Sequence, residues 1–209
     1  METVSLPVGP LQVNSYVLWN SNHDGLIVDP GAEPDKILAC VRQHGVRPTA
    51  ILLTHGHVDH IGAVPHIAAA FDIPVILHRA DHPLYGSPSN ALPPWLPPVE
   101  GLPQAVATEE NRIDGAWALS ILPTPGHTPG SVSYYFPGDA CAFSGDALFS
   151  GSIGRTDLPG GDHEQLRSSL LRELMALPPQ TRVYPGHGPR TTIGEEAASN
   201  PFLCQNGTV

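Results

Sequence analysis

The feature that most constrains the fold is an apolar run that ends in a cluster of polar side chains. The segment TAILLT, residues 49–54, is typical of a strand that is covered on both faces. It runs directly into a turn that holds four metal-ligating side chains in six positions: His55, His57, Asp59 and His60. Because sites in α/β proteins gather at strand ends, this pattern predicts an α/β fold with a functional site after the strand.

The rest of the chain continues the alternation of strands and helices. The patterns predict strands at 13–19, 25–31, 73–78, 117–124, 131–136, 141–149 and 181–188, and helices at 34–45, 61–71 and 162–177. Asp162 with Gln165 has the spacing of a capping box at the start of the last helix. Its apolar stripe consists of Leu166, Leu170, Leu174 and Leu177. This order favours an α/β sandwich with helices outside two sheets, formed as a single domain over residues 1–209.

The segment 83–103 interrupts this pattern with seven prolines. Proline lacks a backbone donor, so no regular element is expected there. Such a long loop is either a lid over a pocket or a rigid surface crossover, and both interpretations stay open.

Composition and charge exclude several classes of function. The formal net charge is -10 with only ten Lys and Arg, so DNA or RNA is not expected as a partner. No apolar run approaches ~18 residues, and the first residues lack a signal-peptide pattern, so neither a membrane span nor secretion is expected. The odd and widely spaced cysteines, Cys40, Cys141 and Cys204, indicate free thiols. The sequence therefore predicts a cytoplasmic protein and leaves its oligomeric state open.

Further metal-ligating side chains follow other predicted strands in turns rich in Gly or Pro: His127, Asp146 and His187. Neutral imidazoles and carboxylates suit Zn, Fe and Mn. Seven ligands are too many for one tetrahedral zinc but fit two divalent ions that share a carboxylate. Asp29, in the sequence IVDPG, is either a turn residue or an acceptor that fixes a ligand imidazole.

The combined motifs resemble those of the metallo-β-lactamase fold superfamily. THGHVDH matches T-H-x-H-x-D-H, and PGHTPG, SGD and PGHG follow in the expected order. The resemblance implies an αββα sandwich, with two mixed sheets and helices on the outer faces. It also implies that one metal is bound by His55, His57 and His127, the other by Asp59, His60 and His187, with Asp146 between them.

Within this superfamily the chain is similar to the compact bacterial members of the glyoxalase II group, the hydroxyacylglutathione hydrolases. The similarity rests on GDALFSGSIGRTDLPGGD (145–162) and GHGPRTTIGEEAASNPFL (186–203). It implies a small thioester substrate such as S-lactoylglutathione, with Arg155 as a glutathione contact. Larger members carry an additional C-terminal helical domain, and we expect none in this protein. The main class of true β-lactamases has Cys where Asp146 stands, so β-lactam hydrolysis is not expected.

The main hypothesis for the reaction is thioester hydrolysis, in which a hydroxide that bridges the two metals attacks the thioester carbonyl and one metal polarises the carbonyl oxygen. Asp59 would orient this nucleophile, and the thiolate leaving group needs no strong general acid. One alternative is a persulfide dioxygenase with a single iron on His55, His127 and Asp146. Another is a metallo-hydrolase of the same fold that acts on a different ester or lactone. A closed structural zinc site is disfavoured because no Cys belongs to the set.

Overall fold

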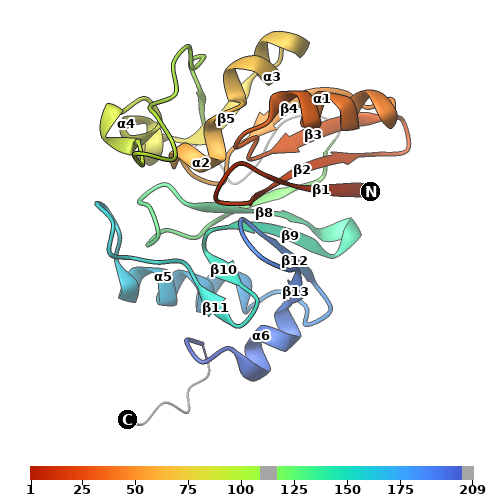
Figure 1. Cartoon of the computed structure of the whole chain (residues 1–209). Coiled ribbons are helices and arrows are strands. Elements are labelled where there is room, and N and C mark those ends of the chain that lie inside the picture. Colours follow the sequence, from red (N-terminus) through yellow and green to blue (C-terminus); the bar gives the residue numbers. More distant parts are fainter. Residues whose placement is uncertain (109–116, 204–209) are drawn as a thin grey trace. The chain divides into compact units, whose positions relative to one another are not determined.

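The computed structural model describes residues 1–108 and 117–203. The chain divides into two compact units, Met1–Thr108 and Glu109–Val209, each of which has its own sheet and helices (Figure 1).

The first unit is built on a six-stranded mixed sheet with strand order β1-β2-β3-β4-β5-β6. The strands β1, β2 and β3 are antiparallel neighbours, whereas β3, β4, β5 and β6 run parallel. The strands are β1 (Glu2–Val8), β2 (Val13–Trp19), β3 (Asp24–Val28), β4 (Arg47–Leu52), β5 (Val75–His78) and β6 (Val106–Thr108). The helices are α1 (Pro34–Gln43), α2 (Val58–Ile61), α3 (Val64–Phe71) and α4 (His82–Tyr85), with short 3-10 turns η1 (Arg79–Asp81) and η2 (Pro88–Asn90).

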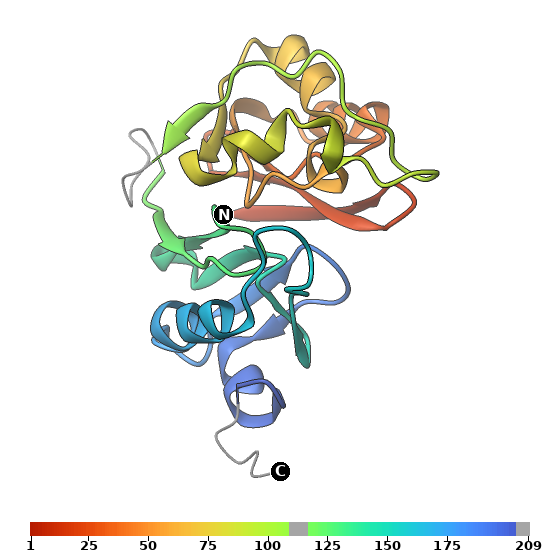
Figure 2. The ribbon, with the colours of Figure 1, turned by 90° about the vertical axis from the view of Figure 1, so that its left-hand side faces the viewer.

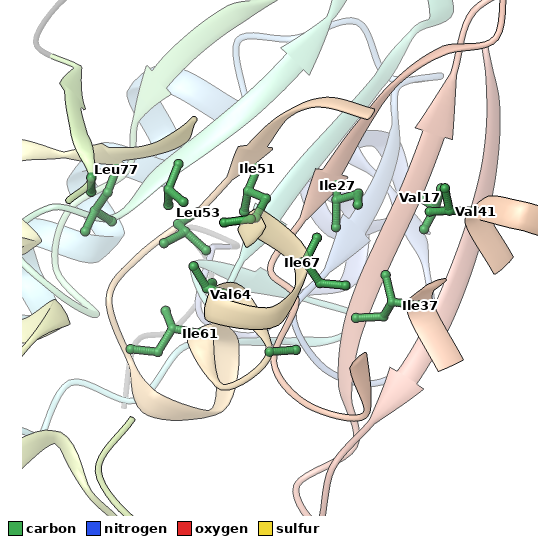
Figure 3. Packing of buried hydrophobic residues seen from close by; sticks show 14 of the residues in the cluster. Val17, Ile27, Ile37, Val41, Ile51, Leu53, Ile61, Val64, Ile67 and Leu77 are labelled. Atoms are coloured by element: carbon green, nitrogen blue, oxygen red, sulfur yellow. The ribbon is translucent and has the colours of Figure 1, made fainter. Parts of the chain in front are cut away.

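The core of this unit lies between the sheet and the helices that cover it. Figure 3 shows Ile27 and Ile51 of the strands against Ile37 of α1 and Ile67 of α3, and all four are fully buried. Burial of one such side chain contributes roughly 1.5–3 kcal/mol. The packed strands and helices therefore give the turns at the strand ends a rigid base.

The second unit has a five-stranded mixed sheet with strand order β13-β12-β9-β8-β7, and α5 and α6 lie together on one side of it (Figure 1; Figure 2). Leu166, Leu170 and Leu174 are fully buried in a core that includes Val183 of β12. The strands are β7 (Ser120–Pro123), β8 (Val132–Phe136), β9 (Cys141–Gly145), β12 (Arg182–Pro185) and β13 (Thr191–Thr192), with a separate hairpin of β10 (Leu148–Phe149) and β11 (Ser152–Ile153). The helical elements are η3 (Pro137–Asp139), α5 (His163–Ser169), the π-helical segment η4 (Leu170–Leu174) and α6 (Ile193–Ser199).

Most predicted elements occur close to their expected positions. The strand at 13–19 has the expected bounds, and Asp162 caps α5 by accepting a hydrogen bond from the Gln165 N–H at 2.9 Å. The expectation that 83–103 contains no regular element is wrong at its beginning, where α4 ends and η2 forms. In both, proline occupies the first turn, where its missing N–H costs nothing.

Two other predictions need correction. The helix expected at 61–71 is two helices, of which the first already begins at Val58. The helix expected at 162–177 turns π-helical at Leu170. No helix within residues 1–108 and 117–203 has the length and apolar character needed to cross a membrane.

Candidate metal centre

The first group of predicted ligands lies at one edge of the sheet in the first unit. Because β3 and β4 are parallel, their carboxyl ends meet at this edge, and Val28 pairs with Leu52. The N–H of Asp29 donates to the carbonyl of Leu52 at 3.1 Å. Asp29 is therefore held beside the turn formed by residues 54–60, which we call the ligand loop.

Asp29 organises the beginning of this ligand loop from a buried position. Its Oδ1 accepts a hydrogen bond from the backbone N–H of Thr54 at 2.8 Å. Its Oδ2 accepts from the Thr54 hydroxyl at 2.6 Å and lies 2.9 Å from Nδ1 of His60. Since both oxygens already accept hydrogen bonds, we interpret Asp29 as a support for His60 rather than as a ligand, although its carboxylate lies near His55 and His60. Thr54 is a contributor that the sequence interpretation did not single out.

These contacts determine which imidazole nitrogens carry protons. A carboxylate only accepts, so Nδ1 of His60 carries the proton that it donates to Asp29. The single hydroxyl proton of Thr54 goes to Asp29, so the 3.0 Å contact between Thr54 Oγ1 and His55 Nδ1 requires His55 to donate. In neutral His55 and His60 the Nε2 atoms therefore hold the lone pairs that a metal ion needs.

The four side chains of the ligand loop lie close to one another. The ring centroid of His55 is 4.8 Å from that of His57 and 4.2 Å from that of His60. Nε2 of His60 lies 3.8 Å from Oδ2 of Asp59. Within the first unit, the fold thus brings together His55, His57, Asp59 and His60 as donors of nitrogen and oxygen.

Two buried side chains from the following segment hold the ligand loop by its backbone. Oδ2 of Asp81 accepts a hydrogen bond from the Gly56 N–H at 2.9 Å. Asn90 donates through Nδ2 to the Gly56 carbonyl at 2.7 Å and accepts from the Val58 N–H at 3.1 Å. The sequence interpretation missed both residues, because nothing in their local pattern marks them out from ordinary turn residues.

The second group of predicted ligands lies at one edge of the sheet in the second unit. The strand β9 is parallel to β12, and β8 is antiparallel to both β7 and β9, so β7, β9 and β12 run in one direction. His127 follows β7, Asp146 follows β9 and His187 follows β12. The topology therefore delivers all three to the same edge of this sheet.

Asp146 lies between the two histidines of this edge. Its Oδ2 is 3.7 Å from Nε2 of His127 and 3.6 Å from Nε2 of His187. Two donors bound to one ion at about 2.0–2.2 Å lie about 3.0–3.6 Å apart for common coordination angles. Each histidine nitrogen is thus spaced from the Asp146 oxygen nearly as two ligands of one ion are spaced.

The tautomer of His127 is fixed in the same way as those in the first unit. Its Nδ1 lies 2.7 Å from the backbone carbonyl oxygen of Arg155, which can only accept. The proton is therefore on Nδ1, and Nε2 faces Asp146. Gly154 packs against the same two residues, since a Cβ there would meet the Asp146 carbonyl oxygen at 1.9 Å and the Cβ of His127 at 3.3 Å.

The side chain of Arg155 is paired with Asp157. Nε and Nη2 of Arg155 donate to the two carboxylate oxygens of Asp157, each at 2.7 Å, and both side chains are about two-thirds exposed. This hydrogen bonding from Arg155 lowers the pKa of Asp157 to about 2 and raises the pKa of Arg155. The guanidinium of Arg155 therefore lies at the surface in an exposed ion pair.

A buried carboxylate on α6 holds the hairpin that connects Asp146 to Arg155. Glu196 accepts hydrogen bonds from the Gly151 N–H at 3.0 Å, the Thr191 hydroxyl at 2.6 Å and Nδ2 of Asn200 at 2.7 Å. Asn200 also donates to the carbonyl of Ser152 at 3.1 Å. The GEEAASN segment therefore fixes the hairpin, a role that the sequence motif did not reveal.

The donor sets suit divalent metal ions. Each unit offers imidazole nitrogens whose opposite ring nitrogen is held by a hydrogen bond, together with a carboxylate that is only partly buried. No cysteine belongs to either set, and the described cysteines, Cys40 and Cys141, are buried elsewhere as free thiols. Imidazole and carboxylate ligands of this kind bind Zn, Fe or Mn.

Comparisons with known proteins agree with this donor set. A family model described as the metallo-beta-lactamase superfamily matches residues 8–187. The chain is 43% identical to the probable metallo-hydrolase YqgX of Bacillus subtilis, over 95% of each protein. It is 37% identical to the hydroxyacylglutathione hydrolase GloC of Haemophilus influenzae, over 95% of this chain and 96% of that protein.

Two solved structures are similar over nearly the whole chain. The structure of the BLEG-1 B3 metallo-beta-lactamase has a TM-score of 0.91 at 42% identity and covers 97% of this chain and 99% of its own. The structure of TTHA1623 in a di-iron-bound form has a TM-score of 0.88 at 46% identity and covers 96% of this chain and 100% of its own. The predicted fold class, with two mixed sheets and their helices, is thereby confirmed.

Proposed function

The chain belongs to the metallo-β-lactamase superfamily as a metal-dependent hydrolase, and on that premise we propose that it hydrolyses thioesters of the hydroxyacylglutathione type. The observation that carries the substrate class is the 37% identity to GloC over nearly the full length of both proteins. The donor sets of the two units support the dependence of this reaction on metal ions.

The proposed centre holds two divalent metal ions. His55, His57 and His127 would bind one ion and Asp59, His60 and His187 the other, with Asp146 shared between them. When bound, the ions would supply Lewis acidity that activates water and stabilises negative charge on the carbonyl oxygen. Zinc is the metal we propose, and iron is the competing choice because TTHA1623 has been solved with two iron ions.

The side chains of the protein perform the remaining tasks. Asp59 is partly exposed and, besides serving as a ligand, would orient the nucleophile by accepting a hydrogen bond from it. The leaving thiolate has a pKa of about 8.5, so it departs without a general acid. Arg155 would bind a carboxylate of the glutathione portion by exchanging it for Asp157.

The test is hydrolysis of S-lactoylglutathione by protein loaded separately with Zn, Fe or Mn. We expect turnover in the wild type and its loss in His57→Ala and Asp59→Ala. His163→Ala is the matched control, since His163 is an exposed histidine at the start of α5. Wild-type activity no greater than that of the two ligand variants would refute the proposal.

A second candidate substrate is a β-lactam. The 42% identity to BLEG-1, a protein described as a B3 metallo-β-lactamase, favours it, although Asp146 stands where the main class of β-lactamases has Cys. A chromogenic β-lactam offered to the same preparations distinguishes the two. A preference for the β-lactam over the thioester, judged by kcat/KM, would replace our assignment.

The remaining alternatives are decided by the same preparations. A persulfide dioxygenase would consume oxygen on addition of glutathione persulfide and bind one iron per chain. A hydrolase of another ester or lactone would cleave that substrate at a higher kcat/KM than S-lactoylglutathione. We propose a cytoplasmic protein, consistent with the free buried thiols Cys40 and Cys141.

A further inference from the structure

We propose that Asn90 is a positioning residue for His57. Through the buried amide of Asn90, the proline-rich segment 83–103 supports the ligand loop of the metal centre. This inference rests on the proposed function, because it takes His57 to be a metal ligand. It concerns a residue to which the sequence motifs assign no role.

Asn90 makes hydrogen bonds to the backbone on either side of His57. Its Nδ2 donates to the carbonyl of Gly56 at 2.7 Å, and its Oδ1 accepts from the N–H of Val58 at 3.1 Å. These are the peptide groups directly before and after His57. The amide orientation follows from its partners, since a carbonyl only accepts and an N–H only donates.

The hydrogen bond from the Val58 N–H to Asn90 also satisfies the first N–H of α2. Val58 is the first residue of α2, and an N–H at this position has no partner inside its own helix. His57 precedes it with extended backbone angles (φ -66, ψ 147). Because Asn90 caps the helix from outside, the imidazole of His57 is not required for capping and can serve as a ligand.

The amide of Asn90 is itself held in place. Asn90 is only 7% exposed and ends the 3-10 turn η2, where its N–H donates to the carbonyl of Ser87 at 3.0 Å. Asp81 holds the other side of Gly56 through the N–H at 2.9 Å. A buried amide with two backbone partners and a fixed main chain is a rigid support, as precise ligand placement requires.

The proposal predicts how Asn90 variants bind metal. We expect Asn90→Ala to weaken binding of Co²⁺ to the His57-dependent site by about 10–100-fold and to alter the Co²⁺ absorption bands. Asn90→Asp should also weaken binding, because a carboxylate still accepts from Val58 but sets a second acceptor against the Gly56 carbonyl. Ser89→Ala is the matched control: it changes an exposed neighbour in η2 whose hydroxyl contacts Ser87, and it should bind Co²⁺ as the wild type does.

A double-mutant cycle separates positioning from general stability. If Asn90 acts through His57, Asn90→Ala should change Co²⁺ affinity by no more than about twofold in a His57→Ala background. The melting temperature of each metal-free variant shows whether the fold itself has been weakened. Wild-type affinity and absorption in Asn90→Ala would overturn the inference, as would a loss of equal size in the His57→Ala background.

These outcomes are distinguishable from failure of the proposed function. If the wild type binds no Co²⁺, both the metal centre and the role of Asn90 are refuted. If the wild type binds Co²⁺ and the variants behave as expected while no thioester is cleaved, only the substrate is wrong. If the thioester is cleaved and Asn90→Ala is unchanged in affinity and absorption, only the role of Asn90 is refuted.

Discussion

The Nδ1 atom of His127 lies 2.7 Å from the backbone carbonyl oxygen of Arg155, so the main chain of one residue fixes the tautomer of the other. The side chain of Arg155 takes no part in this contact and points its guanidinium at Asp157 instead. The main chain and the side chain of Arg155 thus make separate contacts, one with His127 and the other with Asp157.

Replacement of Arg155 should therefore affect substrate binding but not the metal. We expect Arg155→Ala to raise KM for S-lactoylglutathione by about 2–5-fold with little change in kcat, because an exposed charge contributes modestly to binding. Metal content measured by mass spectrometry should match that of the wild type. A loss of metal from this variant would contradict the separation of the two functions.

Titration of Asp157 provides a test of the ion pair. Its pKa is lowered to about 2, chiefly by the hydrogen bond from Arg155, so the carboxylate should stay ionised as the pH falls from 4 to 3. The lowered pKa means that the pair stabilises the fold above the unfolded pKa and that this contribution is lost as the pH falls towards 2. NMR titration of the carboxyl carbon measures this directly, and Arg155→Ala should raise the midpoint towards the ordinary value of 3.8.

The hydroxyl group of Thr54 should contribute more to stability than the volume of its side chain. Thr54→Val removes the donor to Asp29 and the acceptor for His55, both in buried surroundings. We expect a loss of about 1–3 kcal/mol in the free energy of unfolding of the metal-free protein. Thr54→Ser retains the hydroxyl and serves as the control. Equal urea midpoints for the two variants would show that the hydroxyl does not hold the ligand loop.

Removal of the Glu196 carboxylate should loosen the hairpin between Asp146 and Arg155. Glu196→Ala removes the acceptor of the Gly151 N–H, and it removes one of the acceptors of the Thr191 hydroxyl and of the Asn200 amide. We expect a loss of about 2–4 kcal/mol in the free energy of unfolding, measured by urea denaturation. Glu164→Gln, which alters an exposed carboxylate on α5, should stay within about 0.5 kcal/mol of the wild type.

The two described cysteines should resist alkylation in the native protein. Burial raises the pKa of Cys141 to about 11 and also raises that of Cys40, so little thiolate exists at pH 8. Peptide mass spectrometry after iodoacetamide treatment should find both unmodified when folded and modified in urea. Rapid labelling of either cysteine in the native state would show that its surroundings open readily.

Local sequence patterns predicted the fold and the ligand motifs, but they did not predict the residues that hold the ligand loop and the hairpin in place. The apolar strand at 49–54 and the histidine motif are contiguous in sequence, so both could be recognised. Asn90 and Glu196 act on backbone groups that are 34 and 45 residues away in the chain, a relationship that exists only after folding. The seven ligand assignments and the role of Arg155 stay predictions.

The strand β1 was not predicted, and its place in the sheet explains why. It contains Pro7, which removes a backbone donor and speaks against a central strand. The strand lies at the edge of its sheet, where only one side is paired, so the proline is tolerated. Likewise, the first N–H of α2, that of Val58, donates to Asn90, a contact that no neighbouring residue in the sequence indicates.

Because β7, β9 and β12 run in one direction, the end of the sheet where these strands begin lies away from the predicted ligands and suits the insertion of a tag. The turn η3 between β8 and β9 lies there, and a side chain at Gly138 would meet open space. A peptide tag or reporter inserted at Gly138 would thus be attached at the end of the sheet away from His127, Asp146 and His187, whereas insertions between 146 and 155 would disturb the hairpin that Glu196 holds.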